Sequence, residues 1–311
     1  MRSVGIYLLC FSALVWAQGP LAIRLKSAPA ADVSAPEPTL RSDAHWVRIP
    51  VIATNGFGAS ETGLALGDFE VLEDGVVQEP RHLGFEEGPV SVGIVFDASS
   101  SMDKKIADSR TALRQLFYDA LPEDEYSLVQ FSDEPKLLSG FTSSSAFIER
   151  AVDRINPERA TALFDAVLFA SQKMRGAKNT RKALFILSDG ADNNSRYSEA
   201  ELGRYVRESD VAIYSIAIRS SSHHAGTLRK MSEATGGLSI EVRDMNDLGP
   251  AVAHLNRVLR SHYVLGYVSN QSTRQGDGRY RRVEIKLTAA AAARRELHLN
   301  WRRGYFPAES F

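Results

Sequence analysis

The chain has 311 residues, of which 44% are hydrophobic and 24% are charged, and its formal net charge is -1 at pH 7. This composition is typical of folded globular protein, and the length predicts a large domain with one smaller companion. A net charge so close to zero provides no overall field that would attract nucleic acid or anionic lipid, so neither is expected as a partner.

The first residues have the features of an export signal. Arg2 precedes an apolar run at 4–16, and the short residues Val15 and Ala17 stand at its end. A run of about 13 apolar residues is too short for a membrane span, which needs roughly 20. We therefore predict a signal peptide over residues 1–17 and an exported protein, whether periplasmic, cell-surface or secreted. No later segment is apolar enough to predict a transmembrane helix.

The only cysteine, Cys10, lies inside this predicted signal. Cleavage after Ala17 would leave a mature chain without cysteine, which excludes disulfides, thiol catalysis and cysteine-bound metal. A lipoprotein is not expected, because Cys10 lies within the apolar run and not at its end. Stability must therefore come from a hydrophobic core.

The next segments predict a linker and then a small β unit. Residues 18–40 are rich in Pro, Ala and Ser, which is typical of a flexible linker. From 46 to 54 apolar and polar residues alternate roughly as in a strand, and 68–87 holds short β-type runs around the hairpin dipeptide Asp74-Gly75. We assign 41–88 to an N-terminal β unit.

The pattern changes at 92–96, where VGIVF is a continuous apolar run typical of a strand buried on both faces of a parallel sheet. Strands alternating with helices predict a doubly wound, mostly parallel α/β domain over 89–261. Further buried strands are expected at 126–131, 183–187 and 212–218, and helices at 103–120, 161–175, 198–208 and 246–261.

The last part of the chain returns to alternating β patterns, at 263–269, 279–288 and 296–306. Two β flanks of about 50 residues each would be marginal alone. We therefore predict that the C-terminal β unit, 262–308, pairs with the N-terminal one into a small antiparallel sandwich-like domain that flanks or encloses the α/β domain. Two separate β appendages are the alternative.

Oxygen-bearing side chains follow the buried strands at the places where ligands bind in open α/β sheets. The first strand ends in FDASSSM, so Asp97, Ser99 and Ser101 are spaced to present three oxygens to one point. Thr161 stands at the start of a predicted helix, and Asp189 follows another apolar strand. Hard divalent cations prefer oxygen ligands. Each piece alone is also explained as a helix cap or a turn, but together they predict a metal site.

The order Asp-x-Ser-x-Ser, distant Thr, distant Asp resembles the metal-ion-dependent adhesion site of von Willebrand factor type A domains. The resemblance implies that these five residues hold one divalent cation, Mg²⁺ first and Mn²⁺ or Ca²⁺ as alternatives. In that family the hydroxyls coordinate directly or through water, and the aspartates often act through water. An open coordination position would then accept a Glu or Asp of a protein partner. Ala160 departs from the pattern, because many members have Gly before the Thr.

The flanks, including GLALGDFEVLEDGVVQEP, YVLGYVS and NWRRGYF, look like those of secreted bacterial proteins related to von Willebrand factor type A, over about residues 40–306. This likeness implies no established ligand. It favours an exported adhesion-type module that is not an enzyme. A non-adhesive assembly protein of the cell envelope, with a stabilising metal site, is the alternative function.

A magnesium-dependent phosphatase is a remote alternative, since haloacid-dehalogenase-like enzymes keep an Asp-x-Asp motif at the end of the first strand. Here Ser99 replaces the second Asp and removes the general acid that this chemistry needs. His223 and His224 are interpreted as part of a polar loop. The paired arginines are interpreted as a solvated strand face and not as a positive patch: Arg281, Arg282, Arg294, Arg295, Arg302 and Arg303.

Overall fold

A computed structural model of the chain describes residues 46–56, 58–158, 160–219, 221–270, 279–294 and 296–307. All of them belong to one compact unit. The predicted signal peptide, 1–17, and the predicted linker, 18–40, lie outside the described residues. Within the described ranges, no helix is both long and apolar enough to cross a membrane.

A six-stranded sheet in the order β10-β9-β8-β5-β6-β7 forms the centre of the larger domain. The side chains of β5 (Val90–Asp97) are buried along its whole length, as the run VGIVF predicts. It pairs in parallel with both of its neighbours. The neighbours are β6 (Glu125–Phe131) and β8 (Arg181–Ser188), followed outward by β7 (Pro135–Thr142), which is antiparallel, and by β9 (Ala212–Ile218) and β10 (Ser239–Val242).

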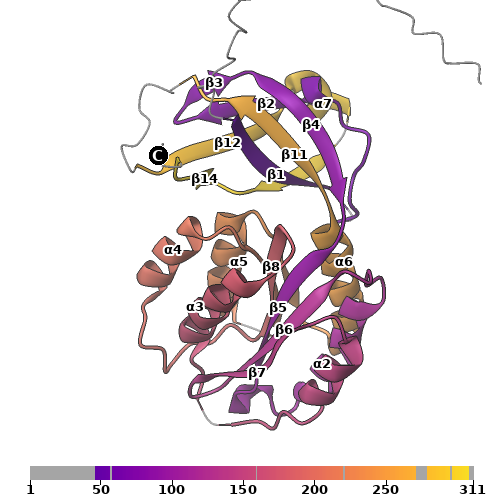
Figure 1. Cartoon of the computed structure of the whole chain (residues 1–311), viewed down its shortest axis with the longest axis vertical. Helices are drawn as coiled ribbons and strands as arrows, with labels where there is room; N and C mark the ends of the chain where they lie inside the picture. The colour runs from indigo at the N-terminus through magenta and orange to yellow at the C-terminus, as the bar shows by residue number, and fades with distance from the viewer. Residues whose placement is uncertain are drawn as a thin grey trace, which may run out of the picture. The chain divides into compact units, whose positions relative to one another are not determined.

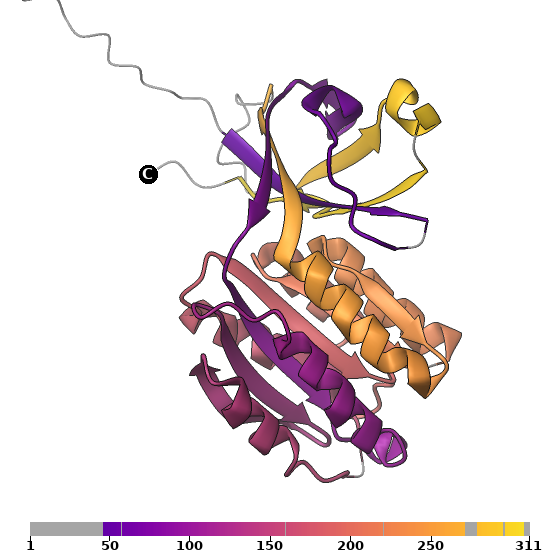
Figure 2. The ribbon, with the colours of Figure 1, turned by 90° about the vertical axis from the view of Figure 1, so that its right-hand side faces the viewer.

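Helices cover both faces of this sheet, and each face has its own apolar core (Figures 1 and 2). One core joins the sheet to α1, α2 and α6, and the other joins it to α3, α4 and α5. Alternate residues of β5 serve the two cores, since Ile94 and Phe96 face one and Val95 faces the other. The helices are α1 (Ile106–Leu113), α2 (Ser145–Val152), α3 (Leu163–Lys173), α4 (Glu199–Glu208), α5 (Ser222–Thr235) and α6 (Leu248–Arg260).

Two antiparallel sheets complete the structure, and each combines strands from before and after the α/β domain (Figure 1). One has the order β13-β1-β11-β4 and the other β14-β12-β2-β3. A third apolar core, which includes Val51, Val71 and Leu265, holds them together. The strands are β1 (Trp46–Asn55), β2 (Phe69–Glu73), β3 (Val76–Gln78), β4 (Pro80–Glu87), β11 (Ser261–Val268), β12 (Arg281–Leu287), β13 (Leu297–Trp301) and β14 (Gly304–Tyr305); a short helix, α7 (Ala289–Arg294), joins β12 to β13.

This architecture confirms the predicted fold class, a mostly parallel sheet between helices beside antiparallel β-structure. The exact domain boundaries, 41–88, 89–261 and 262–308, stay a prediction. The predicted helices at 161–175, 198–208 and 246–261 appear as α3, α4 and α6 with ends shifted by at most two residues. The predicted helix at 103–120 is shorter, because residues 100–102 and 114–117 form 3-10 turns on either side of α1.

The two crossings between the α/β domain and the β sheets lie side by side at the amino ends of the parallel strands. The end of β4 pairs with the start of β11, with Glu87 opposite Ser261. Arg181, the first residue of β8, donates hydrogen bonds to the carbonyl oxygens of Glu86, at 2.9 Å, and of Arg260. One guanidinium thus joins the strand that enters the domain to the helix that leaves it.

Two interpretations of charged or polar segments are wrong. His223 and His224 lie in the first turn of α5, where the Ser221 hydroxyl accepts a hydrogen bond from the His224 amide at 3.3 Å. Arg281 is not on a solvated face, because it is 4% exposed and its guanidinium lies 3.9 Å from the Asp74 carboxylate. β12 turns alternate residues inward, and position 281 falls on the inner side.

The junction between α5 and the end of β13 requires glycine at position 236. Gly236 ends α5 with φ of 81°, and a Cβ there would lie 2.5 Å from the amide nitrogen of Arg302. We expect Gly236→Ala to lower the free energy of unfolding by at least about 2 kcal/mol, from left-handed strain and main-chain overlap together. Urea unfolding measures the difference.

Gly249→Ala is the matched control, because Gly249 lies in the first turn of α6 and a Cβ there meets nothing within 4 Å. Alanine favours the helical backbone by roughly 0.5–1 kcal/mol, so this variant should be as stable as the parent or slightly more stable. Equal stabilities of the two variants would contradict the close approach at Gly236.

Candidate metal centre

The predicted site lies where the order of the parallel strands reverses, between the carboxyl ends of β5 and β8. Chain connections leave β5 toward β6 on one side and return to β8 on the other, which is the switch point where open α/β sheets bind ligands. Phe96 of β5 is in register with Leu187 of β8, so Asp97 and Ser188 are the next residues at the two strand ends. The Ser188 hydroxyl donates to Asp97 Oδ2 at 2.5 Å.

Asp97 also organises the loop that follows β5. Its Oδ1 accepts a hydrogen bond from the amide of Ser99 at 2.8 Å, which turns the chain so that Ser99 and Ser101 lie together. The two serine hydroxyl oxygens are 3.0 Å apart. The Ser101 hydroxyl is in turn hydrogen-bonded to Asp189, the residue that follows β8. The side chains of these four residues therefore form one continuous polar cluster.

Thr161 is held between the two loops by its backbone. Its amide donates to Asn193 Oδ1 at 3.0 Å, and its carbonyl accepts from the amide of Asn193, also at 3.0 Å, in the loop that follows Asp189. On the other side, the amide of Glu158 donates to the carbonyl of Ala98 at 2.6 Å, which joins the segment before Thr161 to the β5 loop. Ala160, the departure from the family pattern, is not among the described residues with positive φ. An alanine is therefore unstrained there.

The five predicted residues come from three loops, and their donor set suits a hard cation. Asp97, Ser99, Thr161 and Asp189 are buried, whereas Ser101 is exposed. The described part of the chain contains no group of three or more His, Cys, Asp or Glu side chains arranged for a metal ion. Two carboxylates with three hydroxyls are instead an all-oxygen set of low charge, which fits Mg²⁺, Mn²⁺ or Ca²⁺ better than a soft metal.

Burial makes the ionised form of Asp97 costly. The side chain has no exposed surface, and burial raises the pKa of its carboxyl to about 6. Hydrogen bonds from Ser188 and Ser99 act in the opposite direction, and the nearby charge of Asp189 adds slightly to the rise. A cation beside Asp97 would favour the charged form.

Asp189 differs because a positive charge lies next to it. Burial would raise the pKa of its carboxyl, but the hydrogen bonds from Ser101 and Lys105 and the charge of Lys105 hold that pKa below its usual value. Lys105 Nζ lies 3.0 Å from Asp189 Oδ2 and also reaches the carbonyl of Ile218 at 3.4 Å. The side chains of Lys105 and Asp189 are only 15% and 9% exposed, so this ion pair is weakly screened by solvent.

Two residues of this cluster were not predicted. Ser188 directly precedes Asp189 at a strand end, and the same reasoning that selects Asp189 also applies to it. Lys105 carries no such signal, because its partner lies 84 residues away in sequence. Gly190, with φ of 75°, supports the turn after Asp189, since a Cβ there would lie 2.7 Å from the carbonyl oxygen of His224.

A doubly wound sheet with oxygen donors from three loops at its switch point defines a class of ligand-binding α/β domain, and comparison with known proteins identifies the family. The model of the von Willebrand factor type A domain matches residues 91–254, slightly more than half of the chain. The chain therefore belongs to the von Willebrand factor type A family. Domains of this family are generally protein-interaction modules and not enzymes.

Individual relatives are distant. Inter-alpha-trypsin inhibitor heavy chain H4 of Sus scrofa is 27% identical over 172 residues, which are 51% of this chain but only 19% of that protein. A von Willebrand factor type A structure from Catenulispora acidiphila is 14% identical, with 79% of this chain and 70% of that one covered and a TM-score of 0.50. Proximal thread matrix protein 1 from the mussel byssus, solved with a zinc-occupied MIDAS motif, is 17% identical over 58% of this chain and 49% of that one, with a TM-score of 0.49.

In the metal-free protein, the buried charge of Asp97 should lower the free energy of unfolding, although the same carboxylate would help to bind a metal ion. Since the native pKa of about 6 exceeds the ordinary aspartate pKa of 3.8, the native state binds more protons than the unfolded state between these pH values, and stability falls as pH rises through that window. We expect Asp97→Asn to unfold at a higher temperature than the parent at pH 8, by the equivalent of about 1–3 kcal/mol. The gain should shrink toward pH 4.

Thermal unfolding of chelator-treated protein at the two pH values measures this difference. Asp119→Asn is the matched control, because Asp119 is exposed and the same substitution there should change stability little at either pH. A destabilised Asp97→Asn protein at pH 8 would show that the carboxylate is favourable even without an ion.

Proposed function

We propose that this chain is an exported, metal-dependent protein-binding module. Asp97, Ser99, Ser101, Thr161 and Asp189 hold one divalent cation, with Mg²⁺ as the first candidate. The observation that carries the proposal is the polar cluster at the switch point, in which Ser188 and Ser99 bind Asp97 and Ser101 binds Asp189. Family membership supports a protein as the partner.

The charge of the cluster explains how the ion would bind a partner. Two carboxylates balance a dication formally, but Lys105 already neutralises part of the charge of Asp189. A bound ion would therefore keep a net attraction for a further anion. The exposed position of Ser101 leaves that side of the cluster open to solvent. A Glu or Asp side chain of a partner protein is the ligand that we propose for this position.

The chemistry of the site favours binding over catalysis. A phosphatase of the Asp-x-Asp type needs a second carboxylate two residues after Asp97 as general acid, and Ser99 stands there. A serine hydroxyl is too weak an acid for this role near neutral pH. We propose that the chain is not an enzyme, in agreement with the usual properties of its family.

Metal binding tests the first part of the proposal. Isothermal titration of the purified, metal-free chain with Mg²⁺ and Mn²⁺ should show one site per molecule, which Asp97→Ala abolishes and Asp119→Ala retains. Diffraction from crystals soaked in Mn²⁺ should place one anomalous peak beside Asp97 and Asp189. Unchanged titration of the Asp97→Ala protein would refute the site.

The position of Lys105 predicts that its positive charge lowers the affinity of the site for Mg²⁺. Its ammonium competes electrostatically with a dication for Asp189, because the two positive charges repel each other across a partly buried site. Lys105→Met should therefore tighten Mg²⁺ binding by at least about fivefold, whereas Lys105→Arg, which keeps the charge, should stay close to the parent. Weaker binding by Lys105→Met would mean that the lysine acts mainly by orienting Asp189.

Capture of partner proteins distinguishes metal-dependent adhesion from an assembly function in which the ion only stabilises the fold. In the presence of Mg²⁺, the immobilised chain should retain partner proteins from an envelope extract. It should lose them when EDTA is added, and the Asp97→Ala variant should not retain them. Circular dichroism should show that the chain stays folded in both cases. If metal removal instead lowers the unfolding temperature strongly and the same partners are captured, the ion stabilises an assembly protein and the adhesion proposal fails.

A further inference from the structure

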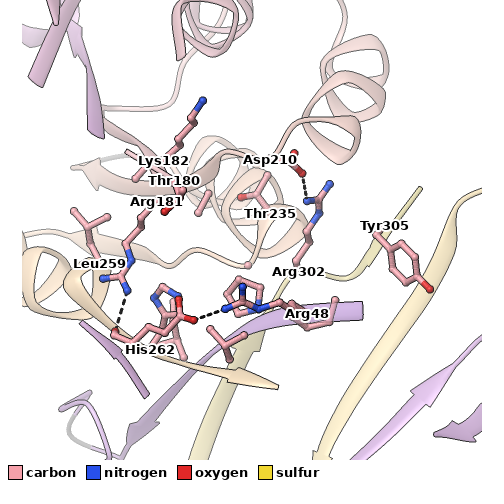
Figure 3. A pocket seen from close by; sticks show the side chains of 18 of the residues that line it. Arg48, Thr180, Arg181, Lys182, Asp210, Thr235, Leu259, His262, Arg302 and Tyr305 are labelled. Atoms are coloured by element: carbon pink, nitrogen blue, oxygen red, sulfur yellow. Dashed lines mark hydrogen bonds and ion pairs between the residues drawn. The ribbon is translucent and has the colours of Figure 1, made fainter. Parts of the chain in front are cut away.

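A cavity of about 830 Å³ lies at the amino ends of the parallel strands, at the other end of β8 from Asp189. Its walls come from the first residues of β8 and β9, the end of α5, and strands β1 and β11 (Figure 3). Small-molecule sites typically enclose about 300–1,000 Å³. The cavity is therefore large enough for a ligand of that kind, and it is separate from the candidate metal centre.

The charged residues that line the cavity have a positive excess. Five basic side chains and three carboxylates line it, and three of the basic groups are paired: Arg48 with Glu86, Arg302 with Asp210 at 2.6 Å, and Arg281 with Asp74 outside the lining at 3.9 Å, which leaves Arg181 and Lys182. The remaining carboxylate, Glu87, accepts a long hydrogen bond of 3.4 Å from the Ser261 hydroxyl. The cavity should therefore attract an anion. The basic residues are Arg48, Arg181, Lys182, Arg281 and Arg302.

Arg181 is the basic group best placed to hold an anion. Its guanidinium donates to the carbonyl oxygens of Glu86 and Arg260, which fix its position without cancelling its charge. Among the described residues, it has no carboxylate within ion-pair distance. A guanidinium remains charged in a protein even where burial lowers its pKa, as burial does for Arg181. Its fork geometry matches carboxylate and phosphate oxygens.

His262 adds a neutral polar group beside this charge. Burial, and then the charge of Arg181, lowers the pKa of the imidazole to about 4, so His262 is uncharged at neutral pH. Within the described part of the chain, no side-chain hydrogen bond is made by this imidazole. It can therefore donate one N–H to a ligand oxygen next to Arg181, with which it shares the cavity wall (Figure 3).

The wall of the cavity also contains apolar residues. The side chains of Ile52, Leu259 and Val264 form its floor but are only 1–3% exposed, whereas Trp46, which is 49% exposed, and the exposed Pro50 present apolar surface to it. An inorganic anion would leave this apolar surface in contact with water. A ligand with both a charged head and an apolar body would cover it, and each buried methylene contributes about 0.8 kcal/mol.

We propose that this cavity binds a small amphipathic organic anion, with its carboxylate or phosphate head on Arg181 and His262 and its apolar body against Trp46 and Pro50. The site would be independent of the metal centre, because the whole length of β8 separates them.

Displacement of a fluorescent amphipathic anion, 1-anilinonaphthalene-8-sulfonate, from the purified full chain tests the proposal. Decanoate and decyl phosphate should displace the probe, and the difference between their affinities identifies the preferred head. Decyltrimethylammonium, with the same apolar length and the opposite charge, should displace it at least about tenfold less well. Equal displacement by the anions and the cation would overturn the proposal.

Two variants and two controls locate the binding. Thr180 lies in an exposed loop at the cavity wall, so Thr180→Trp should obstruct the cavity without loss of folding, and decanoate binding should weaken about tenfold or more. Arg181→Lys keeps a positive charge but loses the fork, and should weaken decanoate about tenfold. Exposed Arg150 on α2 provides Arg150→Gln as the matched control, and Asp97→Ala should also bind normally.

If the Arg181→Lys variant does not fold, the Thr180→Trp variant alone tests whether decanoate binds in this cavity. Parent-like decanoate binding by Thr180→Trp would place the ligand elsewhere on the protein and refute the assignment. The absence of saturable probe binding to the parent chain would refute it as well.

Discussion

The carboxylate of Asp97 is the constraint on which the rest of the site depends. It ends a strand whose every side chain is buried, so it can neither turn to solvent nor be relocated without disrupting both cores of the α/β domain. Hydrogen bonds from Ser188 and from the amide of Ser99 offset part of the cost of burying this group. The same bonds shape the loop that presents the serine hydroxyls. The buried position of Asp97 therefore both lowers the stability of the metal-free protein and arranges the oxygen atoms of the candidate metal site.

The two ends of the parallel strands serve different purposes. At the carboxyl ends, three loops gather oxygen atoms around Asp97 and Asp189. At the amino ends, the chain passes to and from the antiparallel sheets, and Arg181 joins both crossings through main-chain carbonyls. Arg260 at the end of α6 is also paired with the buried carboxylate of Asp124 at 2.7 Å, which fixes the exit from the domain. The cavity lies beside these anchored crossings, and the first residues of β8 and β9 and strand β1 contribute to its wall.

The sequence predicts the elements whose pattern is local. The apolar runs at 92–96 and 183–187 predict buried strands because burial on both faces requires continuous hydrophobicity. Helix α5 was not predicted, because its buried face contains Thr227, Ser232 and Thr235 beside the apolar residues. The Ser, His and Gly residues at its start are also typical of a loop. Arg281 was misassigned because alternation alone does not say which side of a strand faces the core.

The sequence by itself determined that Asp97, Ser99 and Ser101 form one oxygen-rich loop at a strand end. Residues two positions apart lie close together in a loop whatever the tertiary structure. It also indicated that Thr161 and Asp189 follow comparable elements. Only the tertiary structure decided that Lys105 pairs with Asp189, that Ser188 binds Asp97, and that Arg181 and His262 face one cavity. Those contacts join residues from 80 to more than 90 positions apart, and they depend on strand order and register, which long-range packing sets.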